Sequence, residues 1–232
     1  MTIKHLMSTK TTRRTFLKTT AVATIGMPTF IPASALGKNG SVAPSNRIVM
    51  GGIGLGSRGR KDLDGFFKQK DCQFVAIADP QKERREIIKR KTDRHYDNTD
   101  CVTYDDMSGV LGRDDIDAVI IATGDRWHTT ASIHAARAGK DIYCEKPCAM
   151  NIQECQELDD NIKKHRRVFQ AGTQRRSVPN FRLAADLARK GKLGQMKEVH
   201  AGILQLQNYL DPLPAQSEPD PAIINWDKWL GP

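Results

Sequence analysis

The 232-residue sequence lacks the cysteine pattern of a disulfide framework or of a zinc site. Its five cysteines are odd in number and form no Cys-x-x-Cys pair. Cys144 and Cys148 lie close together, but an offset of four residues without a second Cys or His pair is a poor metal motif. Five histidines also occur singly, and none forms a metal-ligand spacing: His5, His95, His134, His165 and His200. We therefore expect no metal site, and small buried hydrophobic positions for most of the cysteines.

A general excess of positive charge is also missing, although the formal net charge is +9. Residues 1–35 hold five basic side chains and no acidic one. The remainder holds 31 basic and 27 acidic side chains, which is an ordinary solvated surface with a net charge of +4. This distribution argues against a nucleic-acid partner, which would need a concentrated basic face.

No apolar run is long enough to span a bilayer as a stable helix. Residues 19–31 form a moderately apolar stretch, but Gly26, Pro28 and several threonines interrupt it. We therefore expect no stable membrane span once the N-terminus is processed.

The N-terminus has the layout of an export signal. Residues 12–18 (TRRTFLK) resemble the twin-arginine signature, and residues 33–35 (ASA) supply a cleavage site after the apolar stretch. We predict a twin-arginine signal peptide over residues 1–35, cleaved near Ala35, a linker over residues 36–46, and a periplasmic protein. A disordered basic tail and an uncleaved membrane anchor remain as alternatives.

From Arg47 onward, short apolar runs alternate with amphipathic segments. Strands are predicted over residues 47–53, 73–78, 118–122, 141–144 and 168–171, and helices over residues 58–70, 80–92, 105–111, 129–138, from Asn151, and 180–190. Asn151 followed by Glu154 is a start typical of a capping box. This alternation predicts right-handed βαβ units and a doubly wound parallel sheet of Rossmann type over residues 47–171.

The pattern changes after Gly194. Residues 196–206 are predicted to form one long strand, and a proline-rich stretch follows it. A single strand cannot cover its own faces and edges. We therefore interpret residues 172–232 as the beginning of a second, α+β domain with a mostly antiparallel sheet, which the 232 residues do not complete.

A glycine-rich turn follows the first strand. Gly54, Gly56 and Gly59 match G-x-G-x-x-G, with Ser57 and Arg58 inside the motif. These glycines allow a tight turn, close approach of a pyrophosphate and close helix–strand packing, while the helix N-terminus offers free N–H groups.

Asp79 follows Gly59 by twenty residues and ends the second predicted strand. An acid there can hydrogen-bond the adenosine ribose and repels a 2′-phosphate, which favours NAD over NADP. Asp79 could also be merely a turn residue before Pro80. Together with the glycines, it predicts a dinucleotide site.

Further motifs make the pattern more specific: residues 117–128 (DAVIIATGDRWH), 138–147 (AGKDIYCEKP), 172–176 (GTQRR), 191–194 (GKLG) and 226–232 (WDKWLGP). From about Arg47 to its end, the chain resembles the Gfo/Idh/MocA family of NAD(P)-dependent oxidoreductases, related to glucose–fructose oxidoreductase and inositol dehydrogenase. The resemblance implies a nicotinamide cofactor, a carbohydrate substrate and, in full-length relatives, possible homo-oligomers.

The resemblance also implies roles for individual residues. Lys146 of the Glu145-Lys146-Pro147 motif would lie beside the nicotinamide and the reacting hydroxyl, where burial would lower the pKa of its ammonium and let it share proton transfer. Cofactor contacts are assigned to the residues of the glycine turn and Asp79, and also to Thr123, Trp127, His128, Glu145, Lys146 and Gln174; Arg176, with Lys146, is assigned to the substrate.

Alternatives stay open for several of these residues. His128 could equally begin a helix without touching a ligand, and Gln174 and Arg176 could be surface ion-pair partners. The family commonly has Pro-Asp-x-x-His where this chain has Gly-Asp-Arg-Trp-His at residues 124–128. The family's usual proton-transferring histidine belongs to the second domain, at a position beyond Pro232.

Three functions follow from these observations. The leading hypothesis is a hydride-transferring oxidoreductase acting on a sugar, polyol or related carbohydrate. The second is an NAD-dependent glycoside hydrolase on the same scaffold. The third is a non-catalytic, truncated nucleotide-binding fragment.

Overall fold

A computed structural model describes residues 35–38, 42–200, 202 and 217–231. The chain divides into two compact units, Met1–Ser45 and Asn46–Pro232. The predicted twin-arginine signature, at residues 12–18, lies outside the described residues. Everything that follows concerns the second unit.

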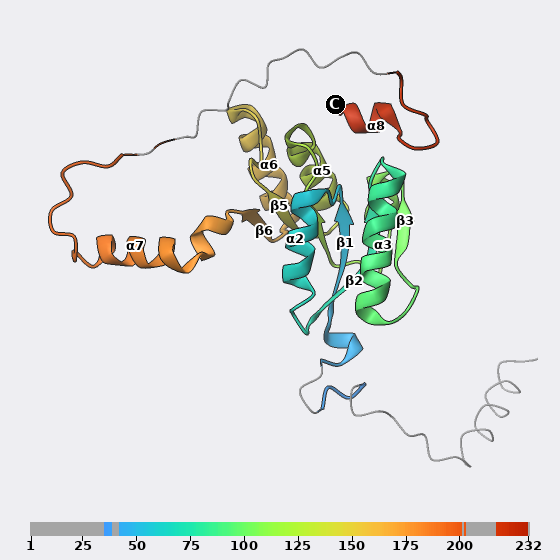
Figure 1. The fold of residues 1–232 in the computed structure, drawn as a ribbon, viewed down its shortest axis with the longest axis horizontal. Helices are drawn as coiled ribbons and strands as arrows, with labels where there is room; N and C mark the ends of the chain where they lie inside the picture. The colour runs from blue at the N-terminus through green and yellow to red at the C-terminus, as the bar shows by residue number, and fades with distance from the viewer. Residues whose placement is uncertain (1–34, 39–41, 201, 203–216, 232) are drawn as a thin grey trace, which may run out of the picture. The chain divides into compact units, whose positions relative to one another are not determined.

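Six parallel strands form one sheet in the second unit (Figure 1). They are β1 (Ile48–Ile53), β2 (Cys72–Ala78), β3 (Val102–Tyr104), β4 (Ala118–Ile121), β5 (Asp141–Glu145) and β6 (Phe169–Gly172). Their order in the sheet is β3-β2-β1-β4-β5-β6, and every neighbouring pair is parallel. The order reverses between β1 and β4, and such a reversal creates a crevice at the carboxyl ends of the strands. The predicted Rossmann-type sheet is confirmed.

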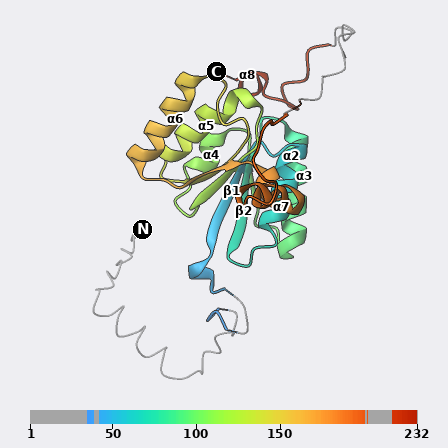
Figure 2. The same ribbon diagram turned by 90° about the vertical axis from the view of Figure 1, so that its left-hand side faces the viewer.

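Helices cover both faces of this sheet, as Figure 2 shows in edge view. On one face, α2 (Ser57–Phe66) and α3 (Lys82–Tyr96) pack through Leu63 and Ile88, which are fully buried. On the other, α4 (Met107–Leu111), α5 (Asp125–Arg137) and α6 (Ile152–His165) close a second core. α5 brings small alanines to that core, which lets the helix lie close to the strands.

The start of α6 is built as the sequence predicts. The side chain of Asn151 accepts a hydrogen bond from the Glu154 backbone N–H at 2.9 Å. The Glu154 carboxylate in turn accepts from the Met150 N–H at 2.9 Å and from the Thr129 hydroxyl at 3.0 Å. The cap therefore fixes the beginning of α6 against α5.

Several predicted boundaries differ from the structure. α5 begins at Asp125 rather than at residue 129, because Gly124 serves as N-cap and Asp125 places an acid in the first turn. α2 ends at Phe66 rather than at residue 70, just after Gly65, a residue that weakens helices. The edge strand β3 was not predicted, because it is only three residues long and its first residue, Val102, is exposed.

The segment after β6 differs most from the prediction. It contains a 3₁₀ turn, η2 (Gln174–Ser177), then α7 (Pro179–Arg189), which confirms the helix predicted over residues 180–190, and later a short helix, α8 (Trp226–Leu230). Residues 196–200 form no strand, and the rest of the predicted strand lies almost wholly outside the described residues. The antiparallel pairing found in the described part is one isolated bridge, between Gln81 and Ile224. Among the described residues, no helix has the length and hydropathy needed to cross a membrane.

Candidate functional site

The glycine turn joins β1 to α2 at the carboxyl edge of the sheet. Gly54 adopts a left-handed conformation with φ of 67°, and a β-carbon there would lie 2.4 Å from Thr123 Cγ2. A β-carbon on Gly59 would lie 2.9 Å from that of Ala122, so α2 can approach β4 only because residue 59 is glycine. α2 has no side-chain cap at Gly56 and no acid in its first turn, so its N-terminal N–H groups are open to an anion.

Asp79 follows the end of β2 and faces the same cleft as the glycine turn. It is only 3% exposed, and its Oδ1 accepts a hydrogen bond from the Gln81 backbone N–H at 2.9 Å. Burial raises the pKa of this carboxyl group, while the Gln81 N–H and the cations Arg84 and Arg85 oppose the rise. Asp79 therefore combines a turn-forming role with a place in the cleft, and the two interpretations of its sequence position are compatible.

The cleft has a volume of about 320 Å³ and lies at the point where the strand order reverses. Beyond the glycine turn and Asp79, its walls include Thr123, Trp127 and the guanidinium-bearing Arg84 and Arg126. The indole Nε1 of Trp127 is buried and has no hydrogen-bond partner among the described residues. This orphaned donor is a group that a ligand could satisfy.

The segment of residues 223–229 forms one wall of the cleft, although it lies far along the chain from the other lining residues. The backbone of residues 223–225 bonds to that of Pro80 and Lys82 at 2.9–3.1 Å. Trp229 stacks on Trp226 at 4.9 Å and packs under the guanidinium of Arg126 at 4.5 Å, and the Trp229 carbonyl accepts a hydrogen bond from the same guanidinium. Lys228 pairs with Asp106 at 3.0 Å, next to the end of β3. Sequence reasoning did not place Lys228 and Trp229 in the site, although the WDKWLGP stretch was a signal for them.

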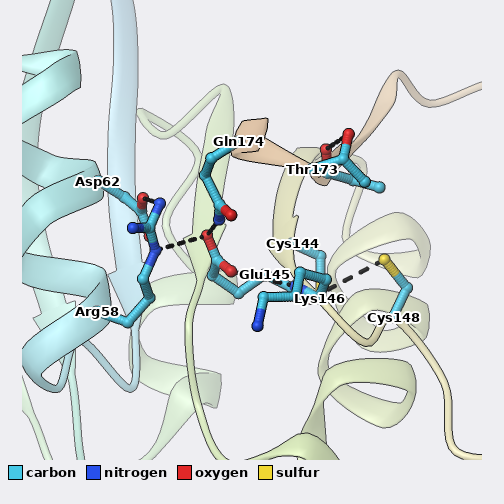
Figure 3. Close-up of polar contacts among 9 residues, drawn as sticks. Arg58, Asp62, Cys144, Glu145, Lys146, Cys148, Thr173 and Gln174 are labelled. Atoms are coloured by element: carbon cyan, nitrogen blue, oxygen red, sulfur yellow. Dashed lines mark hydrogen bonds and ion pairs between the residues drawn. The ribbon is translucent and has the colours of Figure 1, made fainter. Parts of the chain in front are cut away.

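Glu145 ends β5 and is 3% exposed, so its carboxylate must be satisfied within the protein. Figure 3 shows Arg58 approaching it from the left and Gln174 from above. Oε1 accepts from Arg58 Nε at 3.1 Å and from Gln174 Nε2, while Oε2 accepts from the Lys146 backbone N–H at 3.2 Å. These contacts assign to Glu145 and Gln174 a structural junction between α2, β5 and η2.

Lys146 is exposed, contrary to the burial expected from the sequence. Its side chain extends away from the Glu145 junction (Figure 3), and its Nζ has no bonding partner among the described residues. The ammonium is thus free to meet a ligand, but it lies outside the residues that line the cleft.

His128 lies in the first turn of α5 and is 1% exposed. Its Nδ1 is 2.6 Å from the Pro147 carbonyl oxygen, and its Nε2 is buried without a partner among the described residues. It does not line the cleft. This placement matches the alternative of a helix-start histidine, and it adds a contact that holds the turn after Lys146.

Arg176 lies in η2 with its side chain exposed. It follows Gln174, but the described residues do not bring it to the cleft. Its assignment to a substrate therefore stays a prediction, as do the individual ligand contacts assigned to the other residues. No group of three or more metal-ligating side chains is found in the described part of the chain.

Comparison with known proteins agrees with this geometry. Residues 47–173 match the model of the GFO_IDH_MocA oxidoreductase family, described as having an NAD-binding Rossmann fold. The chain belongs to this family. The predicted family is thereby confirmed on more than half of the chain.

Two proteins similar to the chain have names that describe different chemistries. The chain is 30% identical over 134 residues to a 2,7-anhydro-N-acetylneuraminate hydratase of Mediterraneibacter gnavus, which covers 58% of this chain and 33% of the relative. It is 30% identical over 173 residues to an α-N-acetylgalactosaminidase of Shewanella oneidensis, covering 66% of this chain and 37% of the relative. The chain thus spans about a third of the length of these relatives.

Among solved structures, the family fold recurs in a scyllo-inositol dehydrogenase of Lactobacillus casei, with bound NAD(H) and scyllo-inositol. The TM-score is 0.58 at 25% identity, and the match covers 64% of this chain and 42% of that one. A myo-inositol 2-dehydrogenase of Lactobacillus plantarum matches with the same TM-score and identity over 64% and 43%.

The residues present fit a dinucleotide. The glycine cradle has no room for side chains at Gly54 and Gly59, the α2 N-terminus is uncapped, and the buried Trp127 donor lacks a partner. A diphosphate would lie on the glycine turn and a ribose beside Asp79.

Proposed function

We propose that the protein is an NAD-dependent oxidoreductase that moves hydride between the nicotinamide and a sugar, polyol or related carbohydrate. The observation that carries this proposal is the meeting of the glycine turn and Asp79 in one cleft at the switch point of the sheet. When bound, the cofactor supplies the hydride-accepting ring. The chain supplies a cradle for the diphosphate, a carboxylate for the ribose, and the Lys146 ammonium directly after the end of β5.

Asp79 supports NAD over NADP, because its carboxylate would repel a 2′-phosphate. Arg84 lies at the same cleft, with its Nη1 3.2 Å from the place of a β-carbon on Gly56. Its charge acts on Asp79, but its guanidinium makes no hydrogen bond or ion pair among the described residues. A guanidinium there could receive a 2′-phosphate. Both cofactors therefore belong in the test.

The test is isothermal titration of the purified chain with NAD and with NADP. We expect NAD to bind more tightly. Asp79→Asn should weaken NAD binding about 10-fold or more, since it removes a charged acceptor worth about 1.5–3 kcal/mol. The matched control is Asp64→Asn, because Asp64 is a solvent-facing acid on α2 paired with Lys91. Absence of binding for both dinucleotides would refute the proposal.

Lys146 is proposed to stabilise negative charge on the reacting oxygen. Lys146→Ala should keep NAD affinity and lower hydride transfer about 100-fold or more. A loss of only a few-fold would assign that role elsewhere.

A second candidate is an NAD-dependent glycoside hydrolase, which the similarity to the Shewanella α-N-acetylgalactosaminidase favours. Net NADH formation with free sugars and polyols supports the oxidoreductase. Release of a leaving group from an aryl glycoside without net NADH supports the hydrolase. Clean NAD binding with neither activity supports a non-catalytic module.

Export through the twin-arginine route is proposed from residues 12–18 and 33–35. Such a route carries folded proteins, which suits a protein that loads a cytoplasmic cofactor. Replacement of Arg13 and Arg14 by Lys should leave the precursor uncleaved in the cytoplasm, as fractionation and N-terminal sequencing would show. Cleavage near Ala35 in the double variant would refute the proposal.

A further inference from the structure

Arg58 connects two parts of the site that are far apart in the sequence. Its backbone lies in the first turn of α2, directly after the glycine turn, and Arg58 lines the cleft. Its guanidinium contacts two carboxylates. Nη2 donates to Asp62 at 2.6 Å and Nε donates to Glu145 at 3.1 Å, across 87 residues of sequence. The sequence assigned Arg58 to the cofactor, and that contact stays a prediction; Nε and Nη2 of its guanidinium are engaged within the protein.

Glu145 also contacts the backbone of Lys146. The other Glu145 oxygen, Oε2, accepts the backbone N–H of Lys146 at 3.2 Å. The path from the glycine turn to the Lys146 backbone therefore has two hydrogen-bonded steps, and its centre is a nearly fully buried carboxylate (Figure 3).

The charges make this path sensitive to the occupancy of the cleft. One guanidinium serves two buried carboxylates, Asp62 and Glu145, and Asp62 Oδ2 has no partner among the described residues. An anion on the N-terminus of α2 would fix the turn that bears Arg58. It would thereby hold the Nε–H on Glu145.

We propose that Arg58 is a positioning residue, which transmits occupancy of the diphosphate site through Glu145 to the backbone of Lys146. This inference rests on the proposed function, because it needs a diphosphate on the glycine turn. Coupling of this kind is reciprocal, so a change at Glu145 must also alter diphosphate affinity.

The experiment uses ADP, which carries the diphosphate but has no nicotinamide to touch Lys146 directly. Hydrogen exchange of the Lys146 amide is followed by mass spectrometry with electron-transfer fragmentation, with and without saturating ADP. We expect ADP to slow this exchange about tenfold in the wild type, which corresponds to strengthening one hydrogen bond to a charged group.

Three variants test the path. Arg58→Gln and Glu145→Gln should each reduce the ADP effect on the Lys146 amide to less than about twofold, and Arg58→Lys should fall between because an ammonium lacks the planar fork. Arg60→Gln is the matched control, since Arg60 is an exposed cation on the same helix and should keep the full effect. Circular dichroism checks that each variant is folded.

A double-mutant cycle gives the second readout, with ADP affinity measured by titration. If Arg58 acts through Glu145, Arg58→Gln should weaken ADP binding several-fold in the wild type and hardly at all in Glu145→Gln. An equal loss in both backgrounds would show direct contact with phosphate and overturn the inference. So would ADP binding that leaves the Lys146 amide unprotected, while the proposed function would stand. No binding of ADP, NAD or NADP would overturn both.

Discussion

Asp62 gives the sharpest test of the buried charges, because its carboxyl group is held in the folded protein at an energetic cost. Its side chain is 4% exposed, lies in the middle of α2 and pairs with Arg58, while Oδ2 finds no partner among the described residues. Burial, and then the negative charge of Glu145, raises the pKa of Asp62 from about 3.8 to about 6, and Arg58 opposes this rise. Burial and then the charge of Asp62 raise the pKa of Tyr143. Burial lowers the pKa of Arg58, but the hydrogen bond to Glu145 and then the charge of Asp62 outweigh it, so that this pKa is raised.

The sign of the effect on stability follows from this direction. Between pH 4 and pH 6 the folded state binds a proton at Asp62 that the unfolded state has released, so the free energy of unfolding falls as the pH rises through this window. The rise in the pKa of Asp62 from 3.8 to about 6 corresponds to a loss of about 3 kcal/mol in the free energy of unfolding once the pH is well above 6. Asparagine resembles the protonated acid in shape and can donate to Glu145. Asp62→Asn should therefore be stabilising by about 2–3 kcal/mol at pH 8 and nearly neutral at pH 4.5.

The measurement is urea unfolding followed by far-ultraviolet circular dichroism from pH 4.5 to pH 8.5, for wild type and variant. The difference between the two curves isolates Asp62 from other titrating groups. Asp64→Asn is the control on the same helix, where only a surface ion pair with Lys91 is lost, and it should change stability by less than about 1 kcal/mol at every pH. A difference that does not vary with pH, or a variant less stable at pH 8, would refute the reasoning.

Three further substitutions test other parts of the structure. Gly54→Ala would place a methyl group 2.4 Å from Thr123 Cγ2 at a positive φ, so it should cost about 1–3 kcal/mol in urea unfolding and lower NAD affinity; unchanged values for both would contradict the tight turn. Lys140→Ala should cost about 1–3 kcal/mol, because the nearly buried ammonium donates to the Arg113 and Ile116 carbonyls at 2.6 and 2.9 Å, whereas Lys61→Ala, on an exposed helix face, should stay within about 0.5 kcal/mol. Trp229→Ala should weaken NAD binding about tenfold, since it removes an aromatic wall of the cleft, and Trp226→Ala should weaken it less; equal titrations for all three proteins would exclude residues 226–230 from the binding site.

The sheet and the cleft could be predicted from the sequence because their signals are local. The run Ala118–Ile121 is apolar on both faces, as a central parallel strand must be, and the glycine turn follows β1 at fixed spacing. Asp79 could be assigned to the end of β2 because the apolar run of that strand stops just before it. Backbone sterics and burial determine the residues at these positions, and both can be inferred from a short stretch of sequence.

The contacts made by single side chains were not readable in the same way. Arg58 was assigned to the cofactor, and that contact stays a prediction. One of its two carboxylate partners, Glu145, lies 87 positions along the chain, and nothing local to residue 58 indicates it. His128 faces the Pro147 carbonyl because α5 begins a turn earlier than the alanine-rich run suggested. Residues 223–229 pack against the sheet unit through backbone hydrogen bonds to Pro80 and Lys82. The proline-rich sequence before them does not predict these bonds.

The structure suggests how Lys146 could be positioned for its proposed role without being enclosed. Its ammonium is exposed and makes no bond among the described residues, so contacts on the side chain cannot orient it. The backbone is held instead from two directions: Glu145 accepts its N–H, and His128 holds the carbonyl of the next residue, Pro147. Both anchors are at least 97% buried, and buried hydrogen-bonded groups have few alternative conformations. The position of the Lys146 backbone therefore depends on the buried groups beneath it. If Lys146 has the proposed role, substitutions at Glu145 and His128 should lower hydride transfer although neither residue lines the cleft.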